Sequence, residues 1–129
     1  GYVCAPSLFQ QVIERCVDVM PDLTTYEINR SLLIESLERF GYEFAKPDGA
    51  FYLFIRSPFE GGGQSFHERA KEYDMLVVPG ASFGCAEYVR LSYCCTTESV
   101  KKAIPLLEKL IRQAQDRSGE KEGIFNEIV

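Results

Sequence analysis

The sequence predicts a small α+β domain with two layers, a short, mostly antiparallel sheet and helices packed on one face of it. Helix-like and strand-like segments follow one another in the order α, α, β, β, α, β, β, α. Short strands with helices on one side are typical of two-layer α+β domains. The turn sequence "KPDG" joins two consecutive strand-like segments, and such a tight connection favours an antiparallel pair.

Residues 5–20 form the first predicted helix. Apolar residues recur at helical spacing, and Ser7 followed by Gln10 three residues later is typical of a capping box. Pro21 ends the pattern, because proline cannot continue a helix. The apolar positions are Leu8, Phe9, Val12, Ile13, Cys16, Val19 and Met20.

The second predicted helix, residues 24–40, has the clearest pattern in the chain. Thr24 and Glu27 give a second capping-box sequence. Gly41 stands where a left-handed residue ends many helices. The apolar stripe consists of Ile28, Leu32, Leu33, Leu37 and Phe40.

Two strands are predicted on either side of the "KPDG" turn, at 42–45 and at 50–56. The second, "AFYLFIR", is too apolar for a strand with one solvated face, so we expect both of its faces to be buried. The segment 57–65 contains three consecutive glycines. We expect it to be a mobile loop, because glycine has no side chain to pack.

Ser65 and Glu68 give a third capping-box sequence, which predicts a helix from Ser65 to about Asp74. His67, the only histidine, has charged neighbours in this helix and is interpreted as a solvated surface residue. A strand at 75–79 and a glycine-rich connection follow. Neither Ser82 nor Ser92 has an evident base beside it, and we find no complete catalytic constellation in the sequence.

The last predicted strand, "YVRLSYC" at 88–94, carries an arginine in its middle. Because side chains alternate along a strand, Val89, Leu91 and Tyr93 share an apolar face and Arg90 lies on the other. The planar fork of arginine matches the two oxygens of a carboxylate. Arg90 is therefore a candidate for binding a carboxylate, and a salt bridge within the protein is the alternative.

A final helix is predicted from about Thr97, and Pro105 inside it should cause a kink or mark a false start. Its apolar stripe consists of Val100, Ala103, Ile104, Leu107, Leu110, Ile111 and Ala114. We therefore expect one domain at 1–115 and a weakly ordered tail at 116–129, unless its apolar residues dock on the domain. These residues are Ile124, Phe125 and Ile128.

Composition excludes several functional classes. The chain has 129 residues, a net charge of −5 and a pI near 4.9, which argues against binding to nucleic acid or to an anionic membrane. No apolar run is long enough for a membrane helix, and the opening "GYVCAPSLFQ" lacks the basic and apolar regions of a signal peptide, so we expect neither. Five cysteines without paired spacing indicate reduced, structural thiols in a cytoplasmic protein, with a redox role as the alternative. One histidine and no C-x-x-C motif argue against a zinc site. The missing initiator methionine suggests a chain that begins mid-protein or after processing.

Three stretches follow one another in the second half of the chain: "PDGAFYLF" at 47–54, "VVPGASFG" at 77–84 and "VRLSY" at 89–93. Together, and in this order, they resemble the C-terminal small domain of fold-type I pyridoxal-phosphate-dependent aminotransferases of class I/II. The opening "GYVCAPSLFQ" resembles the segment that follows the lysine-bearing region. The resemblance is closest to the aspartate and aromatic aminotransferases and extends from residue 1 to about 114.

The resemblance implies that Arg90 binds the α-carboxylate of an amino acid or 2-oxo acid substrate. It implies more weakly that Phe51 lines the substrate pocket, with a core aromatic as the alternative. For Gly80 and Gly84 it implies backbone roles only.

The remaining machinery of that family belongs to a large domain that precedes the small one. It includes the Schiff-base lysine and the groups that hold pyridoxal phosphate. That cofactor is therefore expected in the full-length parent and not on this chain alone, which would be inactive by itself and holds no catalytic residue. The parent is expected to be a homodimer.

Two alternatives stay open at the level of sequence. The chain could be a non-catalytic, stand-alone binding module, in which case the first helix is the most exposed apolar piece. It could also belong to a lyase or decarboxylase of the same fold family, because a carboxylate-binding arginine is common to several such enzymes. The reaction type depends on groups around the cofactor. The resemblance implies that these groups belong to the large domain and not to this chain.

Overall fold

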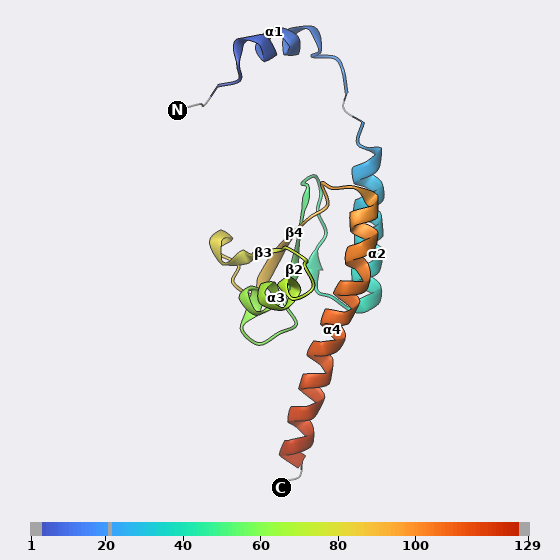
Figure 1. Cartoon of the computed structure of the whole chain (residues 1–129), viewed down its shortest axis with the longest axis vertical. Coiled ribbons are helices and arrows are strands. Elements are labelled where there is room, and N and C mark those ends of the chain that lie inside the picture. Colours follow the sequence, from blue (N-terminus) through green and yellow to red (C-terminus); the bar gives the residue numbers. More distant parts are fainter. Residues whose placement is uncertain (1–3, 21, 127–129) are drawn as a thin grey trace.

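The structure, a computed structural model, describes residues 4–20 and 22–126, with side chains as far as residue 116 (Figure 1). In this part of the chain, four α-helices, one 3-10 helix and four short strands follow one another. They are α1 (Ser7–Arg15), α2 (Thr24–Phe40), β1 (Phe44–Ala45), β2 (Tyr52–Arg56), α3 (Gly62–Lys71), β3 (Val78–Pro79), the 3-10 helix η1 (Gly80–Phe83), β4 (Tyr88–Ser92) and α4 (Thr97–Asn126).

The four strands pair in the order β1-β2-β4-β3, and every pair is antiparallel. β2 and β4 form the centre of the sheet, where Leu53 lies opposite Leu91 and Ile55 opposite Val89. These four residues are buried against α2, α3 and α4. The predicted two-layer α+β domain, with an antiparallel sheet and helices packed on one face, is therefore confirmed.

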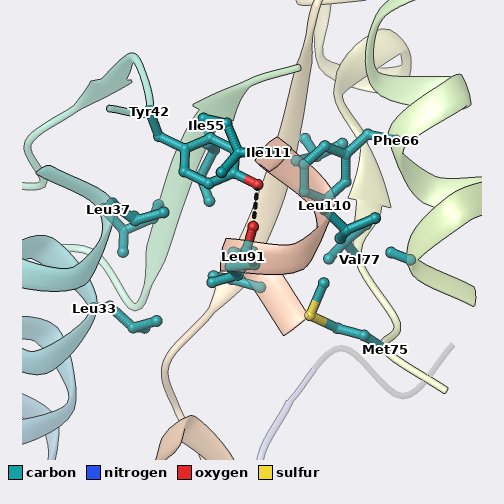
Figure 2. Close-up of a cluster of buried hydrophobic side chains, with 14 of the residues drawn as sticks. Leu33, Leu37, Tyr42, Ile55, Phe66, Met75, Val77, Leu91, Leu110 and Ile111 are labelled. Atoms are coloured by element: carbon teal, nitrogen blue, oxygen red, sulfur yellow. Dashed lines mark hydrogen bonds between the residues drawn. The ribbon is translucent and has the colours of Figure 1, made fainter. Parts of the chain in front are cut away.

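Buried side chains from the sheet and from α2, α3 and α4 meet in one core, part of which is shown in Figure 2. The Tyr42 hydroxyl donates a hydrogen bond to the Leu107 carbonyl at 2.8 Å, so even the polar end of this ring is satisfied inside the core. The largest fully buried apolar side chains are Leu33, Leu37, Leu53, Ile55, Phe66, Val89, Leu107 and Leu110.

The second face of the sheet has no α-helix packed on it in the described chain. Along β2, only Leu53 and Ile55 are buried, Phe54 is half-buried, and Tyr52 is 41% exposed. The prediction that this strand is buried on both faces is therefore wrong for this chain. Its outward apolar residues are aromatic, and they pack against side chains of the same layer.

All three predicted capping boxes are wrong in detail, because each helix begins with another residue as its N-cap. Pro6 precedes α1, and the side chain of Gln10 donates instead to the Ala5 carbonyl at 2.7 Å. Leu23 precedes α2, and Gly61 precedes α3. At the other end of α2 the prediction is confirmed, since Gly41 has a left-handed φ of 81°.

The triple-glycine segment is the start of α3 and not a loop reaching residue 65. Gly62 and Gly63 are buried, and the Gly63 N–H donates to the Ala86 carbonyl at 2.8 Å. A Cβ atom on Gly63 would lie 2.1 Å from the Tyr88 carbonyl oxygen. Glycine is therefore needed here because α3 lies directly against the backbone at the start of β4.

α4 continues through Pro105 as far as Asn126, so the proline marks no false start. Pro105 is exposed, which lets water reach the Lys101 carbonyl that loses its helical partner. Residues 116–126, expected as a weakly ordered tail, are helical in backbone. The side chains of Ile124 and Phe125 and all of Ile128 lie outside the described part, so their docking and the boundary at residue 115 stay predictions.

α1 stands apart from the two layers (Figure 1). Residues 4–20 are all exposed, including the apolar stripe that the sequence assigned to a helix. A helix is confirmed at Ser7–Arg15, but it ends at Arg15 and not at Pro21 as the sequence predicted. Its apolar side chains pack on nothing in the described chain. No helix in the described ranges is both long and apolar enough to cross a membrane.

Candidate functional site

Arg90 lies in the middle of β4, on the face of the sheet that the helices leave open. Its backbone pairs with Phe54 of β2 on one side and with Val78 of β3 on the other. Its neighbours Val89 and Leu91 point into the core. The alternation predicted for "YVRLSYC" is therefore confirmed, and the guanidinium is carried on the central part of a rigid sheet.

Two aromatic rings contact the guanidinium of Arg90. Its Cζ atom lies over the ring of Tyr52, 4.3 Å from the centroid, and over the ring of Phe83, 4.5 Å from the centroid. Phe83 in turn meets Phe54 edge-on, with centroids 5.9 Å apart and an interplanar angle of 88°. The open face thus carries a cluster of three aromatic rings around one positive charge.

The ion pairs of the described side chains do not include Arg90. They join Lys46 to Glu38, Arg56 to Glu43, Lys102 to Glu98 and Arg112 to Glu108. The contacts that the structure gives for the Arg90 guanidinium are the two ring contacts. An internal salt bridge, the alternative left open by the sequence, is therefore not formed within the described part of the chain.

Phe51 lies away from Arg90, on the side of the sheet that faces α2. It precedes β2, its ring packs against Tyr26 of α2 with centroids 5.3 Å apart, and it is 48% exposed. By strand alternation it falls on the side of Leu53, opposite to Arg90. The structure does not bring Phe51 and Arg90 together in this chain, so the role of Phe51 in a substrate pocket stays a prediction.

The turn "PGASFG" forms the 3-10 helix η1 and carries Phe83 to the open face. A Cβ atom on Gly80 would lie 2.3 Å from the Cys85 carbonyl oxygen, and Gly84 has a left-handed φ of 75°. Both glycines therefore let the backbone fold tightly between β3 and β4. The sequence pointed to these glycines but not to Phe83, because only the folded turn places its ring beside Arg90.

Tyr52 was also missed, although the sequence contained a signal for it. In an antiparallel pair of β2 and β4, the alternation that places Arg90 outward also places Tyr52 and Phe54 outward. Which of these residues lie near Arg90 depends on the register between β2 and β4. In the structure, Phe54 lies opposite Arg90, and Tyr52 lies opposite Ser92. Residues at diagonal positions of neighbouring strands are within reach of long side chains.

His67 differs from its interpretation as a solvated surface residue. It is half-buried, and its Nδ1 atom lies 2.7 Å from the Val77 carbonyl oxygen. This contact joins α3 to the segment that enters β3. Its place on the helix side of the sheet separates it from Arg90, so the histidine is a structural contact in this chain.

Comparison with known proteins decides the family. The model of the family described as "Aminotransferase class I and II" matches residues 7–107, which is most of the chain. The chain belongs to this aminotransferase family. It is 41% identical over 80 residues to a probable aspartate/prephenate aminotransferase of Thermus aquaticus, covering 61% of this chain and 21% of the relative. It is 38% identical over 92 residues to aromatic-amino-acid aminotransferase 2 of Thermococcus litoralis, covering 68% and 24%.

Solved aminotransferase structures share the fold. An aminotransferase from Eubacterium rectale matches with a TM-score of 0.78 and 46% identity, over 88% of this chain and 28% of that one. An aspartate aminotransferase of Thermus thermophilus, solved with maleate, matches with a TM-score of 0.66 and 30% identity, over 79% and 26%. The chain thus spans 21% to 28% of the length of these four proteins.

Pyridoxal phosphate is the cofactor that the aminotransferase family implies, and a lysine would have to bind it covalently. The lysines whose side chains the structure describes are all exposed: Lys46, Lys71, Lys101, Lys102 and Lys109. Lys46 and Lys102 are engaged in ion pairs with glutamates. Exposed and ion-paired lysines of this kind do not fit a covalent attachment site for pyridoxal phosphate. We therefore assign no chemical step of the cofactor to residues of this chain.

Proposed function

We propose that this chain is the C-terminal small domain of a pyridoxal-phosphate-dependent aminotransferase, in which Arg90 binds the substrate α-carboxylate. The reaction would transfer an amino group between an amino acid and a 2-oxo acid. The observation that carries the proposal is the Arg90 guanidinium on the open face of the sheet, in contact with two rings and in none of the ion pairs of the described side chains.

The physical chemistry of the site supports this role. A guanidinium offers a planar pair of N–H donors to a carboxylate, and a charge-assisted contact of this kind contributes about 1.5–3 kcal/mol. A central strand holds the arginine more rigidly than a loop would. Holding the carboxylate at a fixed place orients the rest of the substrate, which contributes to rate as well as to affinity.

The remaining parts of the enzyme would come from outside this chain. We propose that a large domain of the same protein supplies the lysine and the cofactor site, and that it faces the open side of the sheet. The parent protein would be a cytoplasmic homodimer acting on amino acids. Closure of the two domains would then exclude water around the bound substrate.

The test is Arg90→Lys in the full-length protein that carries this chain. Lysine keeps the charge but loses the fork, so we expect KM for a carboxylate substrate to rise about tenfold. The affinity for maleate, used as an unreactive dicarboxylate, should fall similarly in calorimetric titration. Arg56→Lys is the matched control, because Arg56 lies on β2 and is paired with Glu43 at 2.9 Å.

Unchanged KM and maleate affinity in Arg90→Lys would remove Arg90 from the site. A stand-alone binding module would have no aminotransferase activity, even as the full-length native protein. A lyase or decarboxylase would act on an amino acid but would not convert a 2-oxo acid into a new amino acid. Assaying amino-group transfer from a donor amino acid to a 2-oxo acid therefore separates the three functions.

A further inference from the structure

We propose that Tyr52 and Phe83 are positioning residues that hold the Arg90 guanidinium ready for a carboxylate. This inference rests on the proposed role of Arg90 and adds the means by which its side chain is fixed. Both rings lie at cation–π distance from Cζ, at 4.3 Å and 4.5 Å from their centroids. Cation–π contacts of arginine operate within about 6 Å of a ring centroid.

The two rings reach Arg90 from opposite sides of its strand. Tyr52 belongs to β2, which pairs with one edge of β4, whereas Phe83 follows β3, which pairs with the other edge. Arg90 is thus flanked on both sides by aromatic faces on the open surface of the sheet. A long side chain with many rotamers is in this way restricted from two directions.

The chemistry of the flanking groups explains why rings suit a binding arginine. A ring attracts the cation through its quadrupole and does not compete as a carboxylate would for the in-plane N–H donors. A carboxylate in either place would occupy the fork and neutralise the charge. The rings therefore restrict the guanidinium while its donors and its charge stay available.

The rest of the cluster supports the same role. Phe54 meets the Phe83 ring edge-on at 5.9 Å, which restricts the ring that faces Arg90. Tyr52 and Phe83 are 41% and 46% exposed, so neither ring belongs to the buried core. Their contact with Arg90 is thus separable from the packing that stabilises the domain.

The experiment measures maleate binding by calorimetric titration to the full-length protein, in pairs of variants that keep or remove each ring. Tyr52→Leu and Phe83→Leu keep apolar bulk but remove the aromatic face, and we expect each to weaken maleate binding about 3- to 10-fold. Tyr52→Phe and Phe83→Tyr keep the ring and should bind within about twofold of the wild-type protein. Arg90→Leu should remove measurable binding.

Tyr73→Leu is the matched control. The Tyr73 ring also lies under a cation, with Lys109 Nζ 4.3 Å from its centroid, but it packs on the helix side of the sheet. Removing this ring should leave maleate affinity unchanged. A loss of affinity in Tyr73→Leu equal to that in Tyr52→Leu would assign the effect to general destabilisation and overturn the inference.

The outcomes separate this inference from the proposed function. Wild-type affinity in both Tyr52→Leu and Phe83→Leu, together with lost binding in Arg90→Leu, would overturn the positioning role and leave the function of Arg90 standing. Wild-type affinity in Arg90→Leu, or no maleate binding by the wild-type protein, would overturn the proposed carboxylate site itself. Weakened binding in the Leu variants with rescue in the ring-keeping variants supports the inference.

Discussion

At the scale of single residues, polar side chains on the two sides of the sheet make different kinds of contact. On the helix side, the fully buried Asn29 donates through Nδ2 to the carbonyls of Tyr93 and Cys95, at 3.1 Å and 2.7 Å. These bonds hold the chain as it leaves β4, because buried backbone acceptors need donors. On the open side, Arg90 is held by rings alone among the contacts that the structure gives.

Tyr42 gives a prediction about pH. Burial raises the pKa of the Tyr42 hydroxyl above its usual value near 10, and the hydroxyl donates to the Leu107 carbonyl. Well below pH 10 the phenol is neutral in both the folded and the unfolded state. As pH rises further, the unfolded chain releases this proton while the folded chain keeps it, so the free energy of unfolding falls.

The measurement compares the wild-type chain with Tyr42→Phe in urea unfolding. At about pH 8 the wild type should be more stable by about 1 kcal/mol, because the variant lacks the buried hydrogen bond. This difference in stability should shrink between about pH 10 and pH 11.5, because only the wild type has the Tyr42 hydroxyl, whose ionisation favours the unfolded chain. A difference that stays constant over this range would show that Tyr42 titrates alike in both states.

At the scale of elements, close backbone contacts fix where α3 and η1 lie. The start of α3 contacts the backbone near Tyr88 at Gly63, and the β3–β4 turn contacts it at Gly80. Through the turn, this packing places Phe83 beside Arg90. The glycine pattern "GGG" looked like a flexible loop in the sequence, since the approach of another segment leaves no trace in the local pattern.

Gly63→Ala should therefore destabilise the domain. The added Cβ atom would lie 2.1 Å from the Tyr88 carbonyl oxygen, so α3 or β4 has to shift. Overpacking of this kind costs about 1–3 kcal/mol, measured as the change in the free energy of unfolding in urea. Gly49→Ala is the control, because nothing lies within 4 Å of a Cβ atom there. Equal stability of the two variants would contradict the close approach.

At the scale of the whole molecule, two apolar surfaces lack a covering layer in the described chain. One is the open face of the sheet around Arg90, and the other is the stripe of α1. The chain corresponds to about a quarter of the length of its relatives. The large domain that we propose for the full-length protein would cover the open face of the sheet.

Removal of residues 1–20 tests the independence of α1 from the folded layers. None of residues 4–20 is buried, and the hydrogen bonds given for this segment stay within it. We expect the free energy of unfolding of the remaining chain to change by less than about 0.5 kcal/mol. In contrast, Leu107→Ala, at a fully buried position of α4, should cost about 2–5 kcal/mol. A comparable loss on truncation would mean that α1 supports the fold.

Much of the architecture could be predicted from local pattern. Periodicity identified α2 and α4, the alternation in "YVRLSYC" separated Arg90 from the core, and Gly41 marked the end of α2. Helix starts were less predictable. At α2 the carboxylate of Asp22 accepts the hydrogen bond of the Thr24 N–H, so a residue outside the expected capping pair provides the local contact.

The sequence by itself determined the α+β class, the face of β4 on which Arg90 lies, and the family to which the chain belongs. These follow from periodicity and from motifs within a few residues, since both are local properties of the chain. Only the tertiary structure decided that Tyr52 and Phe83 flank Arg90, that Phe51 packs on Tyr26, and that α3 begins at Gly62. Each of these depends on strand register or on two distant segments meeting, and the energy of such contacts is set by the fold as a whole.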